Sequence, residues 1–247
     1  MNEAPLLLVA DSHVQPGTVL EKDFFSMLAW LETTDFDVIF LGDNLDLWIA
    51  SGERYESAAH RRFLEWCSRE KRRRRVLMVE GNHEFYVKRH HVQCFTACEE
   101  TFFQQDGVLF LHGDVSQWKF CFHRCFRAFA KNAFGDWVMG WLPFGPAFAR
   151  IMKRGLSRGG VPDREKLLKP MAMVRRFANG FCRRFAVRRV VMGHFHIRIH
   201  EVLEDGGEMD VIPAWKTCGE VGVMGVDGRL NVLPWREMRD GAAKGGC

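Results

Sequence analysis

The amino-acid sequence predicts an α/β protein in which buried strands alternate with helices. Five short apolar runs read as strands buried on both faces of a sheet. Each run is followed, at once or after one residue, by Asp, His or Gly, and open α/β sheets build their sites at the carboxyl ends of such strands. The five runs are residues 6–10, 37–41, 76–79, 108–111 and 189–192.

Capping signals place helices between these strands. Thr18 and Glu21 form a Thr-x-x-Glu capping box, and the helix that follows has its apolar residues on one face. A second helix is predicted from about Ser57 and ends in the basic run 71–75. We interpret this run as cations that solvate a helix C-terminus rather than as a nucleic-acid patch.

After the fifth strand the pattern changes to shorter β-type runs. They cover residues 200–202, 209–212, 221–226 and 230–233, and Asp227-Gly228 predicts a hairpin turn between the last two. The tail, residues 241–247, is expected to be disordered.

The size and composition favour an intracellular globular protein. A chain of 247 residues fits one large α/β domain, or a domain with an inserted subdomain. No basic n-region precedes the first apolar run, so we expect no secretory signal. The longest uncharged run, 137–149, contains Gly and Pro and is shorter than the roughly 17–25 apolar residues of a membrane span. Eight cysteines in this context predict reduced thiols in the cytosol.

The overall charge of +4 hides a strong asymmetry. Residues 119–189 contain 17 Lys and Arg against three acidic residues, a net +14, which leaves −10 for the remainder. The basic segment is also rich in aromatic residues at helical spacing. It is therefore predicted to meet something anionic and apolar, such as a headgroup and acyl chain at a membrane surface.

The five strand ends carry polar motifs that suit a divalent metal site. In an extended Asp-x-His or His-x-His both side chains point to one face, so both could reach one ion. Glycines in the motifs let the backbone pass close to the ions. Mixed carboxylate, imidazole and amide donors favour Mn, Fe or Zn over thiophilic metals. The motifs are Asp11-Ser12-His13, Gly42-Asp43-Asn44-Leu45-Asp46, Gly81-Asn82-His83-Glu84, His112-Gly113-Asp114 and Gly193-His194-Phe195-His196.

In this order the five motifs resemble the calcineurin-like metallophosphoesterase superfamily. The resemblance implies a four-layer αββα sandwich with its core in residues 1–114 and 187–240 and a helical lid insertion at 115–186. It implies two divalent ions, Mn²⁺ by preference with Mg²⁺, Fe²⁺ or Zn²⁺ also suited, and metal-assisted attack of water on phosphorus without a covalent enzyme intermediate.

The resemblance also implies a role for each motif residue. One metal would be held by Asp11, His13 and His196, the second by Asn82, His112 and His194, and Asp43 would bridge both. His83 corresponds to the histidine that supports the attacking oxygen or protonates the leaving group. Asp46 and Glu84 would orient ligands. We expect Asp46 to take part in catalysis with His83, and Glu84 to contact the substrate.

Within the superfamily, further stretches resemble the UDP-2,3-diacylglucosamine pyrophosphatases of lipid A synthesis. The matches are Leu41–Ile49 in full, Glu80-Gly81-Asn82-x-Glu84-Phe85, Leu142-Pro143 in a helical insert, and Ala214-Trp215-Lys216-Thr217-x-Gly219. The resemblance implies release of UMP and 2,3-diacylglucosamine 1-phosphate from an amphipathic UDP-sugar lipid. That family usually has arginine where His83 stands, and this is a clear departure.

These features lead to an expected location and to expected contacts. We expect an enzyme that is cytoplasmic and peripheral on the cytoplasmic face of the inner membrane, with Arg154 and Arg158 as phosphate contacts. A second hypothesis is another phosphodiesterase or phosphatase of the superfamily, including a nuclease that uses the basic insert. Nucleic acid is not the expected partner, because a nuclease does not need an insert this rich in Phe and Trp. A non-enzymatic scaffold is a third hypothesis, but such a protein should have lost ligands, and none of the seven is missing.

Overall fold

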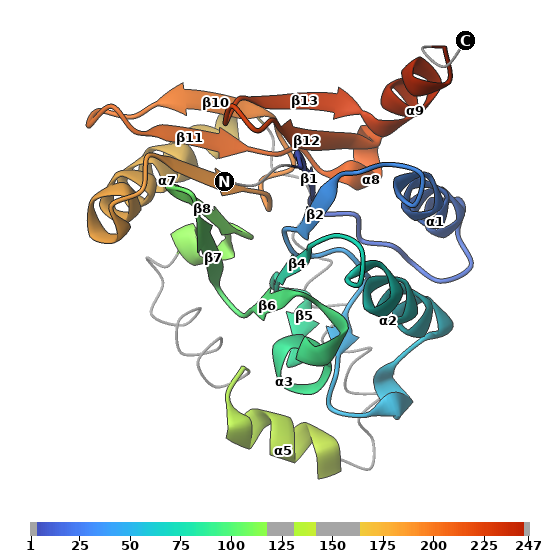
Figure 1. Cartoon of the computed structure of the whole chain (residues 1–247). Coiled ribbons are helices and arrows are strands. Elements are labelled where there is room, and N and C mark those ends of the chain that lie inside the picture. The colour runs from blue at the N-terminus through green and yellow to red at the C-terminus, as the bar shows by residue number, and fades with distance from the viewer. Residues whose placement is uncertain (1–3, 118–130, 142–163, 245–247) are drawn as a thin grey trace.

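The computed structural model describes residues 4–117, 131–141 and 164–244. Most strands in these ranges belong to two main sheets (Figure 1). The six-stranded sheet has the order β13 (Leu230–Pro234), β12 (Glu220–Met224), β1 (Leu6–Val9), β2 (Asp37–Phe40), β4 (Val76–Val79) and β6 (Ala97–Glu99). The five-stranded sheet has the order β10 (Ile199–Val202), β11 (Glu208–Val211), β9 (Arg189–Met192), β8 (Val108–Leu111) and β7 (Phe102–Gln105). A two-stranded sheet pairs β3 (Trp48–Ile49) with β5 (Glu84–Phe85).

The described helices connect and cover these sheets. They are α1 (Val19–Leu31), α2 (Ala58–Glu70), α3 (Val87–His91), α5 (Ala133–Trp141), α7 (Arg164–Phe185), α8 (Trp215–Cys218) and α9 (Trp235–Lys244). Three 3-10 turns join them: η1 (Glu53–Tyr55), η2 (Val92–Cys94) and η3 (Asp114–Gln117). Within the described ranges, no helix combines the length and apolarity needed to cross a bilayer.

Three hydrophobic clusters confirm the predicted four-layer αββα sandwich. One cluster lies between the two sheets and joins Leu8 and Ile39 of the first sheet to Phe110 and Val191 of the second. A second cluster packs α1 and α2 on the outer face of the six-stranded sheet. A third packs α7 on the outer face of the five-stranded sheet. Alternate residues of each central strand therefore serve two different cores, which is why these strands are apolar throughout.

The strand directions explain why the polar motifs meet. β1, β2 and β4 are mutually parallel in one sheet, and β8 and β9 are parallel in the other. Each predicted strand is present, and the Asp227-Gly228 hairpin joins antiparallel β12 and β13 as expected. The carboxyl ends of the parallel strands in each sheet therefore lie along one edge of that sheet.

The capping predictions are confirmed in outline. Thr18 caps α1 by accepting a hydrogen bond from the Glu21 N–H, but the Glu21 carboxylate accepts from Gly17 rather than from Thr18. Ser57 caps α2 in a box completed by the His60 side chain.

The predicted lid insertion, residues 115–186, includes α7, which packs on the five-stranded sheet. α7 has the apolar stripe Met171, Val174, Ala178 and Cys182 at helical spacing, and this stripe is buried against the five-stranded sheet. This part of the chain is therefore the outer layer of the sandwich. Of the remaining insert, the structure describes the short η3 turn and α5 with the residues just before it, and α5 lies beside α3 (Figure 1).

The predicted disorder from Gly241 onwards is wrong up to Lys244. These residues continue α9, which starts at the buried Trp235 and packs that ring against Trp30 at 6.0 Å between centroids. The helix is anchored at its first residue, and Ala242 and Ala243 favour its continuation. Residues 245–247 lie outside the described part of the chain.

Candidate metal centre

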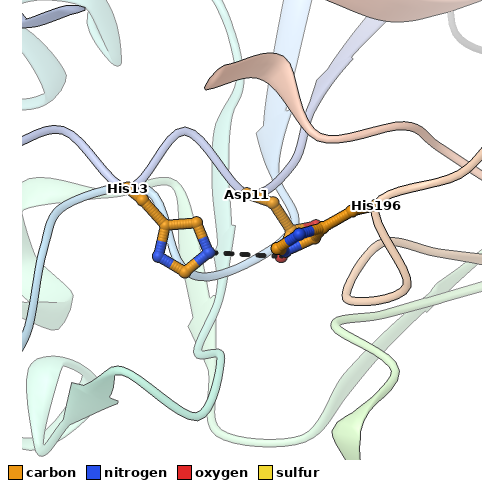
Figure 2. A group of neighbouring side chains, drawn as sticks. All are labelled: Asp11, His13 and His196. Atoms are coloured by element: carbon orange, nitrogen blue, oxygen red, sulfur yellow. Dashed lines mark hydrogen bonds and ion pairs between the residues drawn. The ribbon is translucent and has the colours of Figure 1, made fainter. Parts of the chain in front are cut away.

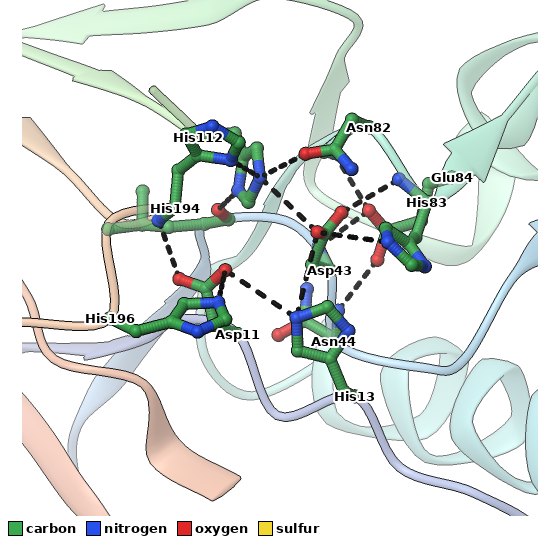
Figure 3. Close-up of polar contacts among 12 residues, drawn as sticks. Asp11, His13, Asp43, Asn44, Asn82, His83, Glu84, His112, His194 and His196 are labelled. Carbon is green, nitrogen blue, oxygen red and sulfur yellow. Dashed lines mark hydrogen bonds and ion pairs between the residues drawn. The ribbon is translucent and has the colours of Figure 1, made fainter. Parts of the chain in front are cut away.

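The structure brings all seven predicted metal ligands into one cluster at the carboxyl ends of five strands (Figure 3). The cluster is built from the loops that follow β1, β2 and β4 in one sheet and β8 and β9 in the other. The predicted residues are Asp11, His13, Asp43, Asn82, His112, His194 and His196.

Asp11, His13 and His196 form the first group of possible ligands (Figure 2). Oδ1 of Asp11 lies 3.2 Å from Nε2 of His196 and 3.8 Å from Nε2 of His13. Nε2 of His13 is buried and has no hydrogen-bond partner. Such separations suit donors that point at a shared ion, since zinc-type metal–ligand distances are about 2.0–2.2 Å.

Asp43 is the centre of the cluster. Its Oδ2 atom lies 3.5 Å from Nε2 of His112, 3.7 Å from Nε2 of His13 and 3.9 Å from Nε2 of His83. Its other oxygen, Oδ1, accepts a hydrogen bond of 2.8 Å from the backbone N–H of His83. One oxygen therefore fixes the carboxylate, while the other faces the imidazoles of both halves of the cluster.

His112, Asn82 and His194 form the second half. Nε2 of His112 lies 3.1 Å from Oδ1 of Asn82 and 3.2 Å from Nδ1 of His194. Nδ1 of His112 donates to the carbonyl of Leu41 at 2.8 Å, which leaves Nε2 as the nitrogen that faces the cluster. This carbonyl sets the tautomer that a metal ligand requires.

The backbone of the cluster is strained in a way that the sequence analysis did not anticipate. The expected extended Asp-x-His and His-x-His geometry is wrong, because Asp11, His13, His194 and His196 have positive φ angles of 53°, 41°, 71° and 57°. Asp43 is also left-handed, with φ of 52°. Such conformations cost of order 1–3 kcal/mol each and gather at functional sites. The side chains converge through left-handed turns rather than through strand alternation.

Two glycines are required by close approach, as the sequence predicted. A Cβ on Gly81 would lie 2.2 Å from Oδ1 of Asp43, and one on Gly193 would lie 2.6 Å from Oδ2 of Asp11. A side chain at either position would displace a carboxylate of the cluster.

Glu84 holds together the two loops that carry Asp43 and Asn82. It is fully buried, and its two oxygens accept hydrogen bonds from the N–H groups of Asp43, Asn44 and Gly81 at 2.6, 2.7 and 2.8 Å. Its predicted orienting role agrees with this geometry. Its predicted contact with substrate stays a prediction, and in this structure backbone donors occupy both oxygens.

The electrostatics of the cluster favour a cation. Burial alone would raise the pKa of Asp43, but the charge and hydrogen bond of His112 outweigh it and hold that pKa well below its usual value. Burial would lower the pKa of His112, yet Asp43 and Asp11 prevail and raise it to about 10. Burial lowers the pKa values of His13 and His194 to about 4. Two ionised carboxylates thus face one imidazolium and two neutral imidazoles.

Four further residues were predicted to act in catalysis or in substrate binding, and the structure describes two of them. His83 is buried, its ring meets that of His13 edge-on at 4.9 Å, and its Nδ1 has no hydrogen-bond partner. Asp46 is absent from the groups of side chains that could share an ion, so its catalytic role stays a prediction. Arg154 and Arg158 lie outside the described residues.

Two lysines near the cluster were not assigned a role from the sequence. Lys216 is the second residue of α8, and its backbone N–H donates to the carbonyl of Asp11 at 3.4 Å. Its half-buried ammonium interacts with the charges of Asp11, Asp43 and Asp46. Its position in the Ala214-Trp215-Lys216-Thr217 motif was the available signal. Lys131 contacts the loop of Asn82, and the sequence offers no signal for that contact because it is formed across 50 residues.

The comparisons with known proteins agree with this geometry. The family model for calcineurin-like phosphoesterases matches residues 4–198. The chain belongs to this family. The protein is a metal-dependent phosphoester hydrolase, and its clustered Asp and His side chains suit the dinuclear divalent metal site of the family.

Structural neighbours are distant, and no curated protein matches the chain. A predicted phosphoesterase from Streptococcus pneumoniae has 12% identity and a TM-score of 0.43, with 96% of this chain and 92% of that chain covered. A mutant of Vps29 from Entamoeba histolytica has 12% identity and a TM-score of 0.43, with coverage of 93% and 97%. Nuclease MPE from Pseudomonas putida has 13% identity and a TM-score of 0.38, with coverage of 92% and 87%. Likeness at this level carries no argument about substrate.

Proposed function

We propose that this protein hydrolyses the pyrophosphate bond of UDP-2,3-diacylglucosamine and releases UMP and 2,3-diacylglucosamine 1-phosphate. The observation that carries the proposal is an aromatic stripe on α5. This helix begins two residues after Lys131, which contacts the loop that carries Asn82. Phe134, Trp137 and Trp141 are 58%, 60% and 74% exposed, and their ring centroids follow one another at 6.1 and 6.3 Å. An exposed aromatic stripe of this kind suits acyl chains.

The opposite face of α5 is fixed to the core, which holds the stripe in place. Asp136 is buried, accepts a hydrogen bond of 2.7 Å from the Ser51 hydroxyl, and lies 2.9 Å from Nε2 of His90. Arg54 and Tyr55 donate to the carbonyl of Met139, each at 2.8 Å. These contacts join α5 to the loop after β3 and to α3.

Under this proposal the two halves of the cluster hold one divalent ion each. Asp11, His13 and His196 would hold the first and Asn82, His112 and His194 the second, with Asp43 available to both. Mn²⁺ is the ion we expect, and Mg²⁺, Fe²⁺ and Zn²⁺ also suit these donors. Bound ions of this kind supply Lewis acidity to a phosphoryl group.

The protein's own groups would then position and protonate the substrate. His83 reaches the cluster through Nε2 and is the group we assign to protonation of the departing phosphate oxygen. Lys216 adds a cation beside the first ligand group, where it can attract the anionic pyrophosphate. Arg154 and Arg158 remain proposed phosphate contacts.

A membrane location is part of the same proposal. Outside α7, residues 119–158 carry a net charge of +7, from eight Lys and Arg against Asp136, and this charge and the aromatic stripe on α5 match a surface with anionic headgroups and acyl chains. We therefore propose peripheral binding at the cytoplasmic face of the inner membrane, where such a lipid precursor is presented.

The decisive test measures the UMP that purified, Mn²⁺-loaded protein releases from candidate substrates. UDP-2,3-diacylglucosamine should be cleaved, whereas UDP-N-acetylglucosamine, which lacks the two long acyl chains, should be cleaved much more slowly. Hydrolysis of a simple aryl phosphodiester, which has no acyl chain, measures the activity of the metal centre alone. Hydrolysis of the diester with no UMP from the lipid would refute the lipid substrate and favour another phosphodiesterase activity.

Matched variants test the role of α5. Trp137→Ala combined with Trp141→Ala should lower UMP release from the lipid by at least ~10-fold, since about 1.5–3 kcal/mol of apolar burial is lost per side chain, and should leave diester hydrolysis unchanged. Val202→Ala removes an equally exposed apolar side chain on β10 and should change neither rate. Equal losses on both substrates would mean that the stripe serves folding.

A further inference from the structure

Lys131 reaches from the insert into the loop that carries Asn82. Its ammonium donates to the carbonyl of Gly81 at 2.7 Å and to Oε2 of Glu80 at 3.1 Å. The side chains of Lys131 and Glu80 are only 7% and 1% exposed, so this is a buried ion pair. The ammonium also lies 5.5 Å from the centre of the Phe85 ring. The lysine is therefore enclosed by the segment Glu80–Phe85.

Glu80 ties this lysine to the surrounding backbone. Oε1 of Glu80 accepts a hydrogen bond of 2.8 Å from the N–H of Lys88 in α3, and the N–H of Glu80 donates to the carbonyl of Glu99 at 2.9 Å. The carboxylate thus has a backbone donor on one oxygen and the Lys131 ammonium on the other. Removal of the ammonium would leave a buried carboxylate without its counter-charge.

The contact with the Gly81 carbonyl bears directly on a metal ligand. That carbonyl and the N–H of Asn82 belong to one planar peptide, so fixing the oxygen fixes the start of Asn82. The other side of Gly81 is also held, because its N–H donates to Glu84 at 2.8 Å. Glycine allows wide backbone freedom, and these two contacts remove it at the residue before the ligand.

We propose that Lys131 is a positioning residue for the second metal ion. It fixes the Gly81 peptide and hence the carbonyl oxygen of the Asn82 side chain, so that metal affinity depends on the insert being seated on the core. The proposal rests on the two-ion centre assigned above, but not on the identity of the substrate. Because Asp136 anchors α5 next to Lys131, the insert and the second half of the metal centre behave as one unit.

The test measures Mn²⁺ binding to metal-free protein. Calorimetry gives the affinity for each ion, and electron paramagnetic resonance shows whether the two ions are coupled. Wild type should bind two ions and show the signal of a coupled Mn²⁺ pair. Lys131→Met should bind the second ion at least ~10-fold more weakly, the range typical of lost outer-shell contacts, and show isolated Mn²⁺ at one equivalent per chain. Affinity for the first ion should change less than twofold.

Lys88→Met is the matched control. Lys88 lies in neighbouring α3, and its ammonium pairs with Glu99 of β6 at 2.5 Å. This variant removes one Lys–Glu ion pair and one positive charge at a similar place, while its backbone N–H still donates to Glu80. Both Mn²⁺ affinities should match wild type.

Two further variants keep the proposal testable if Lys131→Met does not fold, as judged by circular dichroism. Lys131→Met with Glu80→Gln removes the buried charges as a pair and should still bind the second ion weakly, because the Gly81 contact is lost. Lys131→Arg can donate to both acceptors and should come within a few-fold of wild type. Wild-type affinity for the second ion in a folded Lys131→Met or double variant overturns the proposal. No substrate is used, so a failure to release UMP leaves this inference unaffected.

Discussion

Oδ2 of Asp43 lies 3.5 Å from Nε2 of His112, and these two atoms join the halves of the metal centre. The first comes from the loop after β2 in one sheet, and the second from the residue that follows β8 in the other. The site therefore exists only where the two sheets are packed together, with the cluster of Leu8, Ile39, Phe110 and Val191 between them.

Asp43→Asn should remove the shared ligand without changing the shape of the side chain. Loss of the charge should weaken the binding of both ions and lower hydrolysis of an aryl phosphodiester by more than ~100-fold, because loss of a shared ligand should exceed the cost of about 10–100-fold that is typical of an outer-shell contact. Metal content after dialysis should fall below two ions per chain. Asp106→Asn changes an exposed carboxylate in the turn before β8, away from the strand end that carries His112, and should retain both ions and full activity.

Metal binding should release a proton from His112. Its pKa of about 10 means that the metal-free protein carries this proton at pH 8, whereas His13 and His194, with pKa values of about 4, are already neutral. Affinity for the second ion should therefore rise with pH up to about 10, by as much as ~10-fold per unit. Calorimetry in two buffers of different ionisation enthalpy should give about one proton released per protein. No release at pH 8 would contradict the raised pKa.

Gly81→Ala should destroy the centre, because its Cβ would overlap Oδ1 of Asp43 at 2.2 Å. We expect loss of both ions in metal analysis and a lower melting temperature. Gly180→Ala is the matched control, since it lies within α7 with open space around its Cβ. That change should stabilise the protein by about 0.5–1 kcal/mol and leave metal content unchanged. Full metal content in Gly81→Ala would show that the loop can relax.

The sequence predicted the strands and the clustering of the proposed ligands because both depend on local signals. Each strand is a continuous apolar run, and each proposed ligand lies within four residues of the end of such a run. The motif order then supplied the pairing of ligands across 185 residues, as between Asp11 and His196, which periodicity alone does not give.

Other features depend on contacts that no local pattern encodes. The left-handed backbone at Asp11 and His13 arises because the Ala10–Val14 segment pairs with the loop after β2 rather than continuing as a strand. The contact of Lys131 with Gly81 arises from the way the insert docks. The apolar stripe of α7 was visible as a helix, but a helical face does not state which surface it covers, so its place on the five-stranded sheet was missed.

His83 is the histidine expected of a calcineurin-like phosphoesterase, but it departs from the arginine usual in the UDP-2,3-diacylglucosamine pyrophosphatases that the sequence resembles. If its imidazole protonates the departing oxygen, His83→Ala should lower turnover of UDP-2,3-diacylglucosamine by about 10²–10⁴-fold with both ions retained. His83→Arg should lose a similar amount, because a guanidinium stays charged and does not transfer a proton. His200→Ala, which removes an exposed imidazole paired with Asp210 on β11, should leave the rate unchanged. Faster UMP release by His83→Arg than by wild type would show instead that arginine suits this substrate and that His83 adapts the centre to another phosphoester.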